Sequence, residues 1–321
     1  MGRSFLSGMA AVLAAGFILA QPGFGGEREV SIDGGKAPLY GTLLMPDGGR
    51  TVPAVLLLAG SGPTDRDGNS AIPGIKPATL KLIAEGLAAH GIASLRVDKR
   101  AIAKSAPAAT SEADLRFDTY VDDAVAWTKF LKAQPGVGCT FILGHSEGAL
   151  IGALAAGKTP VCGLISISGA GRPIGDVLLE QLHGMPPALF AQAEQILAQL
   201  KTGKTVAEIP PPLMALFRPS VQPYLISWLP TDPAKAIAAV KAPVLIMQGT
   251  TDIQVSGEDA RLLAAARPDA TFVLLEGVNH VLKTAPADPA ANIAAYADPT
   301  LPLAPGVMPA LTAFIDKNAK P

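Results

Sequence analysis

The chain has 321 residues, of which 49% are hydrophobic and 17% charged, and its mean hydropathy is +0.34. Such a chain can bury enough apolar surface to offset the conformational entropy lost on folding, which excludes a disordered protein and a mini-protein. The 26 basic residues balance 27 acidic ones, and no run of Lys or Arg could neutralise a row of phosphates. Nucleic acid is therefore not an expected partner.

The amino-terminal segment has the composition of a secretory signal peptide. Arg3 is its one charged residue, and an apolar stretch runs from Phe5 to Ala20. That stretch is shorter than the roughly 20 apolar residues of a membrane-spanning helix, so a transmembrane anchor is the disfavoured alternative. We expect residues 1–26 to be a signal peptide, the protein to be exported to the periplasm or secreted, and no stable membrane insertion after processing.

From about residue 28 onward, strand-like and helix-like patterns alternate. Glu29–Ile32 and Leu39–Met45 are predicted to form an antiparallel pair, and six further strands are expected at 55–59, 93–97, 140–145, 164–168, 244–248 and 271–275. These six are apolar on consecutive positions, as strands covered on both faces are. Helices are expected between them at 79–90, 117–133, 147–156 and 257–266. The predicted fold class is α/β, with a mostly parallel, doubly wound eight-stranded sheet.

One stretch, residues 172–241, breaks this alternation. It has no strand pattern, but it has helical patches at 176–183, 187–200 and 233–240 with several prolines between them. An insertion at this point lies above the carboxyl ends of the strands, where open α/β sheets bind ligands. We interpret 172–241 as a helical lid, and 27–171 with 242–321 as the core. The alternative is a separate helical domain, which at roughly 70 residues would be marginally stable alone.

The motif Gly144-His145-Ser146-Glu147-Gly148 has the pattern G-x-S-x-G. A predicted buried strand ends just before it, and a helix rich in small residues starts just after it. A serine at such a turn is held in a strained conformation with its hydroxyl exposed above the sheet. The amino end of the helix also places positive charge where an oxyanion develops. Ser146 is therefore the predicted nucleophile, with a plain turn serine as the alternative.

A nucleophilic serine needs a base, and the chain has four histidines. His280 follows the last predicted strand, on a loop at the carboxyl end of the sheet from which its ring can reach Ser146. Asp252 follows the preceding strand on the same edge, and the order Ser, Asp, His is associated with α/β-hydrolases. The predicted catalytic residues are Ser146, Asp252 and His280, with Asp259 and Asp269 as rival acids.

The oxyanion hole that such a nucleophile requires consists of two backbone N–H groups. One is predicted to belong to Glu147, directly after the nucleophile. The other is predicted to come from the loop after strand 55–59, where Gly60 and Gly62 let the backbone approach a substrate oxygen. We expect Ser61 N–H to be that donor. An ordinary Gly/Asp turn is the alternative for this loop.

The two cysteines, Cys139 and Cys162, lie at equal offsets before two successive predicted strands. Successive strands that one helix connects are usually neighbours in a parallel sheet. Neighbouring strands lie about 4.8 Å apart, which brings such Cα atoms within the roughly 4.4–6.8 Å that a disulfide tolerates. Because an exported protein also meets an oxidising compartment, a disulfide is predicted. Two small buried thiols are the alternative.

Four segments together resemble a known family: Ala59-Gly60-Ser61-Gly62-Pro63-Thr64-Asp65-Arg66-Asp67-Gly68-Asn69, Gly144-His145-Ser146-Glu147-Gly148, Gln248-Gly249-Thr250-Thr251-Asp252 and Asn279-His280-Val281-Leu282-Lys283. With them the chain resembles the EstD-like esterases of the bacterial α/β-hydrolase superfamily, within the broader serine aminopeptidase-like hydrolase group. The resemblance covers nearly the whole chain after the signal peptide. It implies hydrolysis of a small-molecule carboxylic ester, with no metal and no organic cofactor.

The chain departs from this family in one loop. Relatives usually carry Asp-Lys-Arg-Gly-x-Gly-x-Ser where this chain has Asp98-Lys99-Arg100-Ala101-Ile102-Ala103-Lys104-Ser105. Loss of both glycines is expected to narrow the loop. We expect the change to affect the substrate range rather than catalysis.

The predicted function is a carboxylesterase-type serine hydrolase that forms an acyl-enzyme on Ser146. Acyl transfer to an amine, or peptide cleavage, by the same three residues is the first alternative, because fold and catalytic residues do not fix the leaving group. The second alternative is a catalytically silent protein that binds a ligand beneath the lid. The presence of Ser, Asp and His together weighs against it.

The mature protein is expected to begin between residues 20 and 27, because the apolar stretch is too short to anchor the chain and Pro22 and Gly23 follow it. The intact mass of protein recovered from the native host measures this. Recovery of the full chain with Met1 from a soluble cytoplasmic fraction contradicts export.

Overall fold

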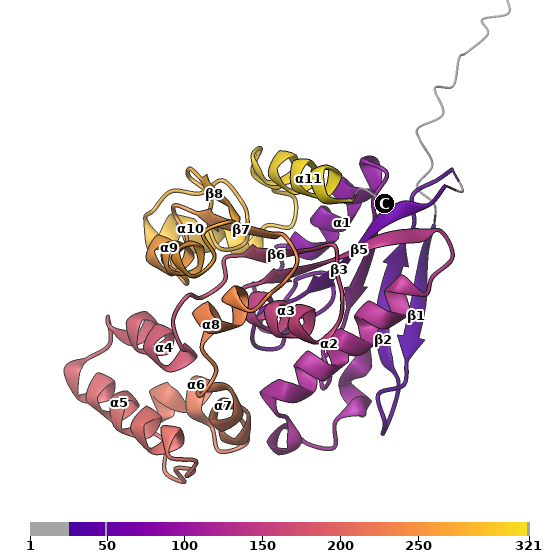
Figure 1. Cartoon of the computed structure of the whole chain (residues 1–321). Coiled ribbons are helices and arrows are strands. Elements are labelled where there is room, and N and C mark those ends of the chain that lie inside the picture. The colour runs from indigo at the N-terminus through magenta and orange to yellow at the C-terminus, as the bar shows by residue number, and fades with distance from the viewer. Residues whose placement is uncertain (1–25, 49, 320–321) are drawn as a thin grey trace, which may run out of the picture.

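The sheet is the central element of the molecule (Figure 1). The computed structural model describes residues 26–48 and 50–319, so the predicted signal peptide lies outside the described residues apart from Gly26. The eight strands are β1 (Glu27–Ile32), β2 (Leu39–Leu44), β3 (Val52–Leu58), β4 (Ala93–Val97), β5 (Val137–His145), β6 (Gly163–Ile167), β7 (Val244–Gly249) and β8 (Thr271–Leu275).

The strand order confirms the predicted α/β class. Across the sheet the order is β1-β2-β4-β3-β5-β6-β7-β8. β2 is antiparallel to both β1 and β4, and all remaining neighbours are parallel. The strands after β2 therefore direct their carboxyl ends to one edge of the sheet, where α/β sheets bind ligands.

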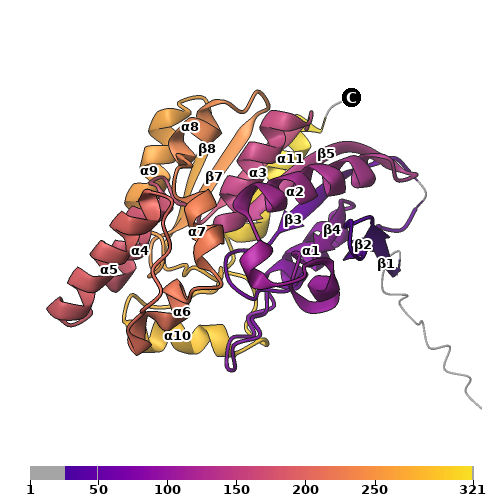
Figure 2. The same ribbon diagram turned by 90° about the horizontal axis from the view of Figure 1, so that it is seen from below.

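Helices cover both faces of the sheet (Figures 1 and 2). The core helices are α1 (Thr79–Ala89), η1 (Ala103–Ala108), η2 (Glu112–Asp114), α2 (Phe117–Lys132), α3 (Glu147–Lys158), α9 (Gly257–Ala266), α10 (Pro289–Ala297) and α11 (Val307–Asn318). The first and last of these, α1 and α11, pack on one face, while α2, α3 and α9 pack on the other. No helix within the described ranges is both long enough and apolar enough to cross a bilayer.

The alternation of side chains along the central strands explains the two covered faces. On β5, Phe141 and Leu143 join the apolar cluster beneath α1 and α11, whereas Ile142 between them joins the cluster beneath α2 and α3. β3 behaves in the same way, with Val55 on one face and Leu56 on the other. Since successive residues of a strand point to opposite faces, a strand covered on both faces is apolar throughout.

The expectation that all six later strands are covered on both faces is wrong for β8. Phe272 is 38% exposed and Leu274 is 42% exposed, while Leu275 on the opposite face is buried. β8 is the last strand of the sheet and has a strand neighbour on one side only. A short apolar run does not distinguish an edge strand from a central one. The apolar sequence of β8 therefore led to the wrong prediction that both of its faces are covered.

The segment between β6 and β7 is helical. It contains α4 (Ile174–Leu182), α5 (Pro187–Lys201), η3 (Pro211–Leu213), α6 (Met214–Phe217), α7 (Gln222–Trp228) and α8 (Pro233–Ala238). The patches predicted at 176–183, 187–200 and 233–240 correspond to α4, α5 and α8. α7 was not predicted, because Pro223 resembles a helix break. In the structure Pro223 lies in the first turn of α7, where proline is tolerated. α10 and α11 were not predicted either.

Cys139 and Cys162 form a disulfide with Cα atoms 5.8 Å apart, which confirms the predicted pairing. β5 and β6 are parallel neighbours, with Phe141 opposite Gly163, and Cys162 N–H donates to Thr140 O. Cys139 lies inside β5 rather than before it, because β5 extends back to Val137. The bond lies toward the amino ends of these strands, away from Ser146.

Reduction of this disulfide is expected to lower Tm while leaving kcat unchanged. The bonded residues are 23 apart in sequence, and closing a loop of that size stabilises a protein by about 3 kcal/mol on the chain-entropy estimate. Calorimetry with and without reductant measures the shift. The double variant Cys139→Ser/Cys162→Ser is the control, since its Tm should not respond to reductant. An unchanged wild-type Tm after verified reduction contradicts the prediction.

Candidate active site

Three loops at the carboxyl edge of the sheet bring the predicted site residues together. Ser146 follows β5 directly, Asp252 follows β7, and His280 follows β8. His280 Nδ1–H donates to Asp252 Oδ2 at 2.8 Å, and both side chains are buried. Ser146 and His280 line the same cavity, although no hydrogen bond joins them within the described residues. Such contacts are often long in ligand-free sites and tighten around a substrate.

Ser146 has a positive φ, with φ 56° and ψ −121°, which is a sparsely populated backbone conformation for a residue other than glycine. Such a conformation costs on the order of 1–3 kcal/mol. It persists because the strand and helix on either side of it are packed tightly: a Cβ on Gly144 would collide with the Gly148 carbonyl, and a Cβ on Gly148 would meet Leu58 O. The turn therefore holds Ser146 at the carboxyl edge of the sheet in the strained geometry that its motif predicted.

The Asp252 carboxylate is held by several donors besides His280. Gln254 and Val255 N–H groups donate to Oδ1 at 2.8 and 3.0 Å, and Gln248 Nε2 donates to Oδ2 at 3.1 Å. Burial by itself raises the pKa of this carboxyl, but the adjacent His280 ring and the backbone donors outweigh burial and lower the pKa to about 2. Asp252 is therefore a charged acceptor at neutral pH, which fixes the Nδ1–H tautomer of His280.

His145 supports the His280 loop. Its Nε2–H donates to His280 O at 2.7 Å, and the two ring centroids are 4.7 Å apart. Burial, together with the nearby His280 ring, lowers the pKa of His145 to about 4. His145 is thus neutral at pH 7 and adds no charge beside His280.

The rival residues have other partners. Asp259 pairs with Arg172 at 2.6 Å, and Asp269, whose side chain is exposed, pairs with Arg267 Nε at 2.6 Å. His90 bonds to the carbonyl of its own helix, and His183 packs edge-on against an aromatic ring. Across residues 26–48 and 50–319, no group of three or more His, Cys, Asp or Glu side chains is arranged to hold a metal ion.

The loop predicted to carry the oxyanion donor lies against Ser146. A Cβ built on Gly60 would lie 3.1 Å from Ser146 Cβ, so the backbone at this position approaches the nucleophile closely. Glu147 is the first residue of α3, where helical N–H groups have no partner within the helix. In the part of the chain that the structure describes, neither Ser61 N–H nor Glu147 N–H has a hydrogen-bond acceptor.

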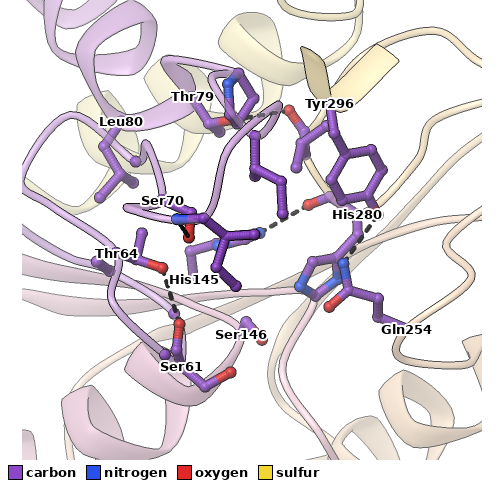
Figure 3. Close-up of a pocket in the computed structure, with 18 of the residues that line it drawn as sticks. Ser61, Thr64, Ser70, Thr79, Leu80, His145, Ser146, Gln254, His280 and Tyr296 are labelled. Atoms are coloured by element: carbon purple, nitrogen blue, oxygen red, sulfur yellow. Dashed lines mark hydrogen bonds between the residues drawn. The ribbon is translucent and has the colours of Figure 1, made fainter. Parts of the chain in front are cut away.

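A cavity of about 250 Å³ opens at Ser146 (Figure 3). Ser61 lies on one side of Ser146 and His280 on the other, and Gln254 and Tyr296 complete the wall near His280. Gln254 Nε2 donates to the Tyr296 hydroxyl at 3.0 Å. Neither residue was predicted, because Gln254 lies in an irregular loop and Tyr296 lies on α10.

A second cavity, of about 380 Å³, lies on the other side of Gly62 and Pro63. Ala101, from the loop in which the chain departs from the EstD-like pattern, is part of its wall. Ala101 and Ala103 have φ of 70° and 45°, the left-handed conformation that favours glycine. The loop therefore keeps a positive φ at both positions despite the substitutions, and Ala101 is the substituted position that lines the cavity.

Several known proteins are similar to this chain. The family model described as serine aminopeptidase, S33, matches residues 78–285, which include Ser146, Asp252 and His280. Esterase EstD of Thermotoga maritima is 29% identical over 261 residues, which are 80% of this chain; the chain spans about 60% of the length of that relative.

Two solved structures share the fold. Est1E of Butyrivibrio proteoclasticus with bound ferulic acid superposes with a TM-score of 0.58 at 18% identity, covering 90% of this chain and 98% of that one. The esterase domain of a Rhodothermus marinus protein superposes with a TM-score of 0.55 at 18% identity, covering 92% and 100%. The chain belongs to the serine aminopeptidase S33 family and has the α/β-hydrolase fold.

Proposed function

We propose that this protein is a serine hydrolase that cleaves carboxylic esters through an acyl-enzyme on Ser146. The observation that carries the proposal is the His280–Asp252 hydrogen bond of 2.8 Å beside a strained serine on the same cavity. A buried aspartate that orients a histidine, which in turn serves a serine, is the arrangement of serine-dependent acyl transfer. The name of EstD, an esterase, agrees with this chemistry.

In the proposed reaction, His280 Nε2 takes the proton of Ser146 Oγ as Oγ forms a bond to the ester carbonyl carbon. The N–H groups of Ser61 and Glu147 hold the oxyanion. When the carbonyl re-forms, the bond to the alcohol breaks, and the alcohol leaves with the proton from His280. Water then gives its proton to His280 and attacks the acyl-enzyme, and the acid leaves as Ser146 regains its proton. No metal or organic cofactor takes part.

Ester cleavage is favoured over removal of amino-terminal residues from peptides by the lining of the cavity at Ser146. An aminopeptidase must bind the charged α-amino group of its substrate, which calls for an acidic side chain close to the nucleophile. The 250 Å³ cavity, as lined by the described residues, contains no Asp or Glu. In the second cavity Glu147 pairs with Lys99 and Glu112 pairs with Arg218, so both carboxylates already have cationic partners.

We further propose that residues 172–241 act as a lid over the core formed by 27–171 and 242–321. Arg218, Val221 and Tyr224 of this segment line the second cavity, and the Tyr224 hydroxyl donates to Glu147, next to Ser146.

We also propose that the protein is exported. The Cys139–Cys162 disulfide is consistent with it, because disulfides persist in oxidising compartments.

Ser146→Ala is expected to abolish ester hydrolysis and fluorophosphonate labelling, because it removes the nucleophile. Tm should stay equal, because only a small hydroxyl is lost, or rise if the smaller side chain relieves strain at this turn. Rates with p-nitrophenyl esters of increasing acyl length, measured beside aminoacyl anilides, test the activity and the leaving-group class together. Ser31→Ala, on the exposed face of β1, is the matched control. Labelling of Ser146→Ala contradicts the assignment.

Asp252→Asn is expected to lower kcat about 10³- to 10⁴-fold, because an amide no longer fixes the His280 tautomer or stabilises its cation. His280→Ala should lose as much activity as Ser146→Ala, since the three residues act as a unit. Steady-state kinetics near pH 7 measure both effects. Asp269→Asn, the exposed rival acid, is the control and should keep wild-type rates. A His280→Ala variant that retains a tenth of the activity points to a different base.

A further inference from the structure

A buried cation beside Ser146 has no part in the reaction as proposed above. Lys99 follows β4, and its side chain is only 10% exposed. Its ammonium group donates to Gly60 O and to Glu147 Oε2, the latter at 3.4 Å, and lies 5.7 Å from the centre of the Tyr120 ring. A lysine ammonium has three donors, and these contacts fix it in one place.

The contact with Gly60 matters because Gly60 O and Ser61 N–H belong to one peptide unit. A trans peptide is planar and points its C=O and N–H in opposite directions, and none of the described peptide bonds is cis. A donor held on Gly60 O therefore determines where Ser61 N–H points. If this peptide rotated, a carbonyl oxygen would replace the N–H near Ser146 and would repel a developing oxyanion.

Glu147 connects the same cation to the second oxyanion donor. Its backbone N–H is that donor in the proposed reaction, and its carboxylate accepts from Lys99 and from the Tyr224 hydroxyl of α7. The side chain is 2% exposed. Burial raises the pKa of this carboxyl, and Lys99 opposes the rise. Lys99 thus ties the loop after β3 to the first residue of α3.

We propose that Lys99 is a positioning residue. It fixes the positions of the two oxyanion donors, Ser61 N–H and Glu147 N–H, relative to each other, so that both can point at the same substrate oxygen. Glu147 anchors the Lys99 ammonium, and Tyr224 anchors Glu147 from the helical segment 172–241. The inference rests on the proposed serine hydrolase function. The cluster of Lys99, Glu147 and Tyr224 is not explained by stability alone, because the attraction within a buried ion pair only about offsets the free energy needed to desolvate its charges.

Lys99→Met removes the ammonium group and keeps most of the side-chain volume. We expect kcat for a short p-nitrophenyl ester to fall about 10- to 100-fold with KM within about twofold. The loss should stay below the roughly 10²- to 10³-fold that removal of an oxyanion donor costs, because the donors remain in the chain. The inhibition constant of an alkyl trifluoromethyl ketone, whose adduct carries the oxyanion, should rise by the same factor as kcat falls.

Lys104→Met is the matched control. Lys104 lies in the same loop, pairs with Glu29 and lies 4.7 Å from the centre of the Tyr40 ring, so it makes similar contacts away from Ser146. It should keep wild-type kcat and inhibition. Glu147→Gln and Tyr224→Phe keep the shapes of the two side chains and leave the Glu147 N–H in place. Both variants should lower kcat and weaken ketone inhibition, by smaller factors than Lys99→Met. If Lys99→Met does not fold, these two variants test the proposal instead.

Wild-type ester hydrolysis and fluorophosphonate labelling separate this inference from the function on which it rests. If the wild type neither labels nor hydrolyses esters, the proposed function fails and the role of Lys99 falls with it. If the wild type is active and folded Lys99→Met keeps kcat within twofold, the positioning role alone is wrong. A raised KM at unchanged kcat, or weaker catalysis with unchanged ketone inhibition, also overturns it.

Discussion

The close approach of three backbone segments around Ser146 is the constraint on which the site depends. Strand β5, helix α3 and the end of β3 meet where any side chain at Gly144 or Gly148 would collide with a carbonyl group. This packing sets the strained, positive-φ conformation of Ser146 and brings Gly60 against it. The strain at one serine is thus maintained by the apolar packing of both faces of the sheet, which the helices supply.

Ion pairs hold the loop that follows β3 in the same neighbourhood. Arg66 pairs with Asp98 at 2.6 Å, and Arg96 pairs with Asp67, so the loop is tied both to β4 and to the residue that follows β4. Asp98 and Arg96 are each 2% exposed. Because such charges are costly to bury without their partners, these pairs restrict the loop to few conformations. The loop that faces Ser146 is therefore held by charge, whereas the serine turn is held by packing.

The α/β class, the eight strands and the order in which Ser146, Asp252 and His280 follow strands of the sheet could all be predicted from the sequence. These features are local: apolar runs bounded by Gly and Pro define strands, and the carboxyl ends of parallel strands meet at one edge. The Cys139–Cys162 pairing could also be predicted, because the two cysteines have equal offsets from successive strands that are neighbours in the sheet. Asp252 could be selected over its rivals by the same reasoning about sheet edges.

Tertiary structure alone decided the features that depend on distant segments. The apolar sequence of β8 gave no sign that Phe272 and Leu274 are exposed, because coverage of an edge strand depends on which helices pack beside it. Tyr224 and Lys99 meet at Glu147 from two elements far apart in the chain, and no residue pattern within either segment encodes that contact. Local spacing specifies strands and turns, whereas contacts between side chains of separate elements exist only after the helices have packed on the sheet.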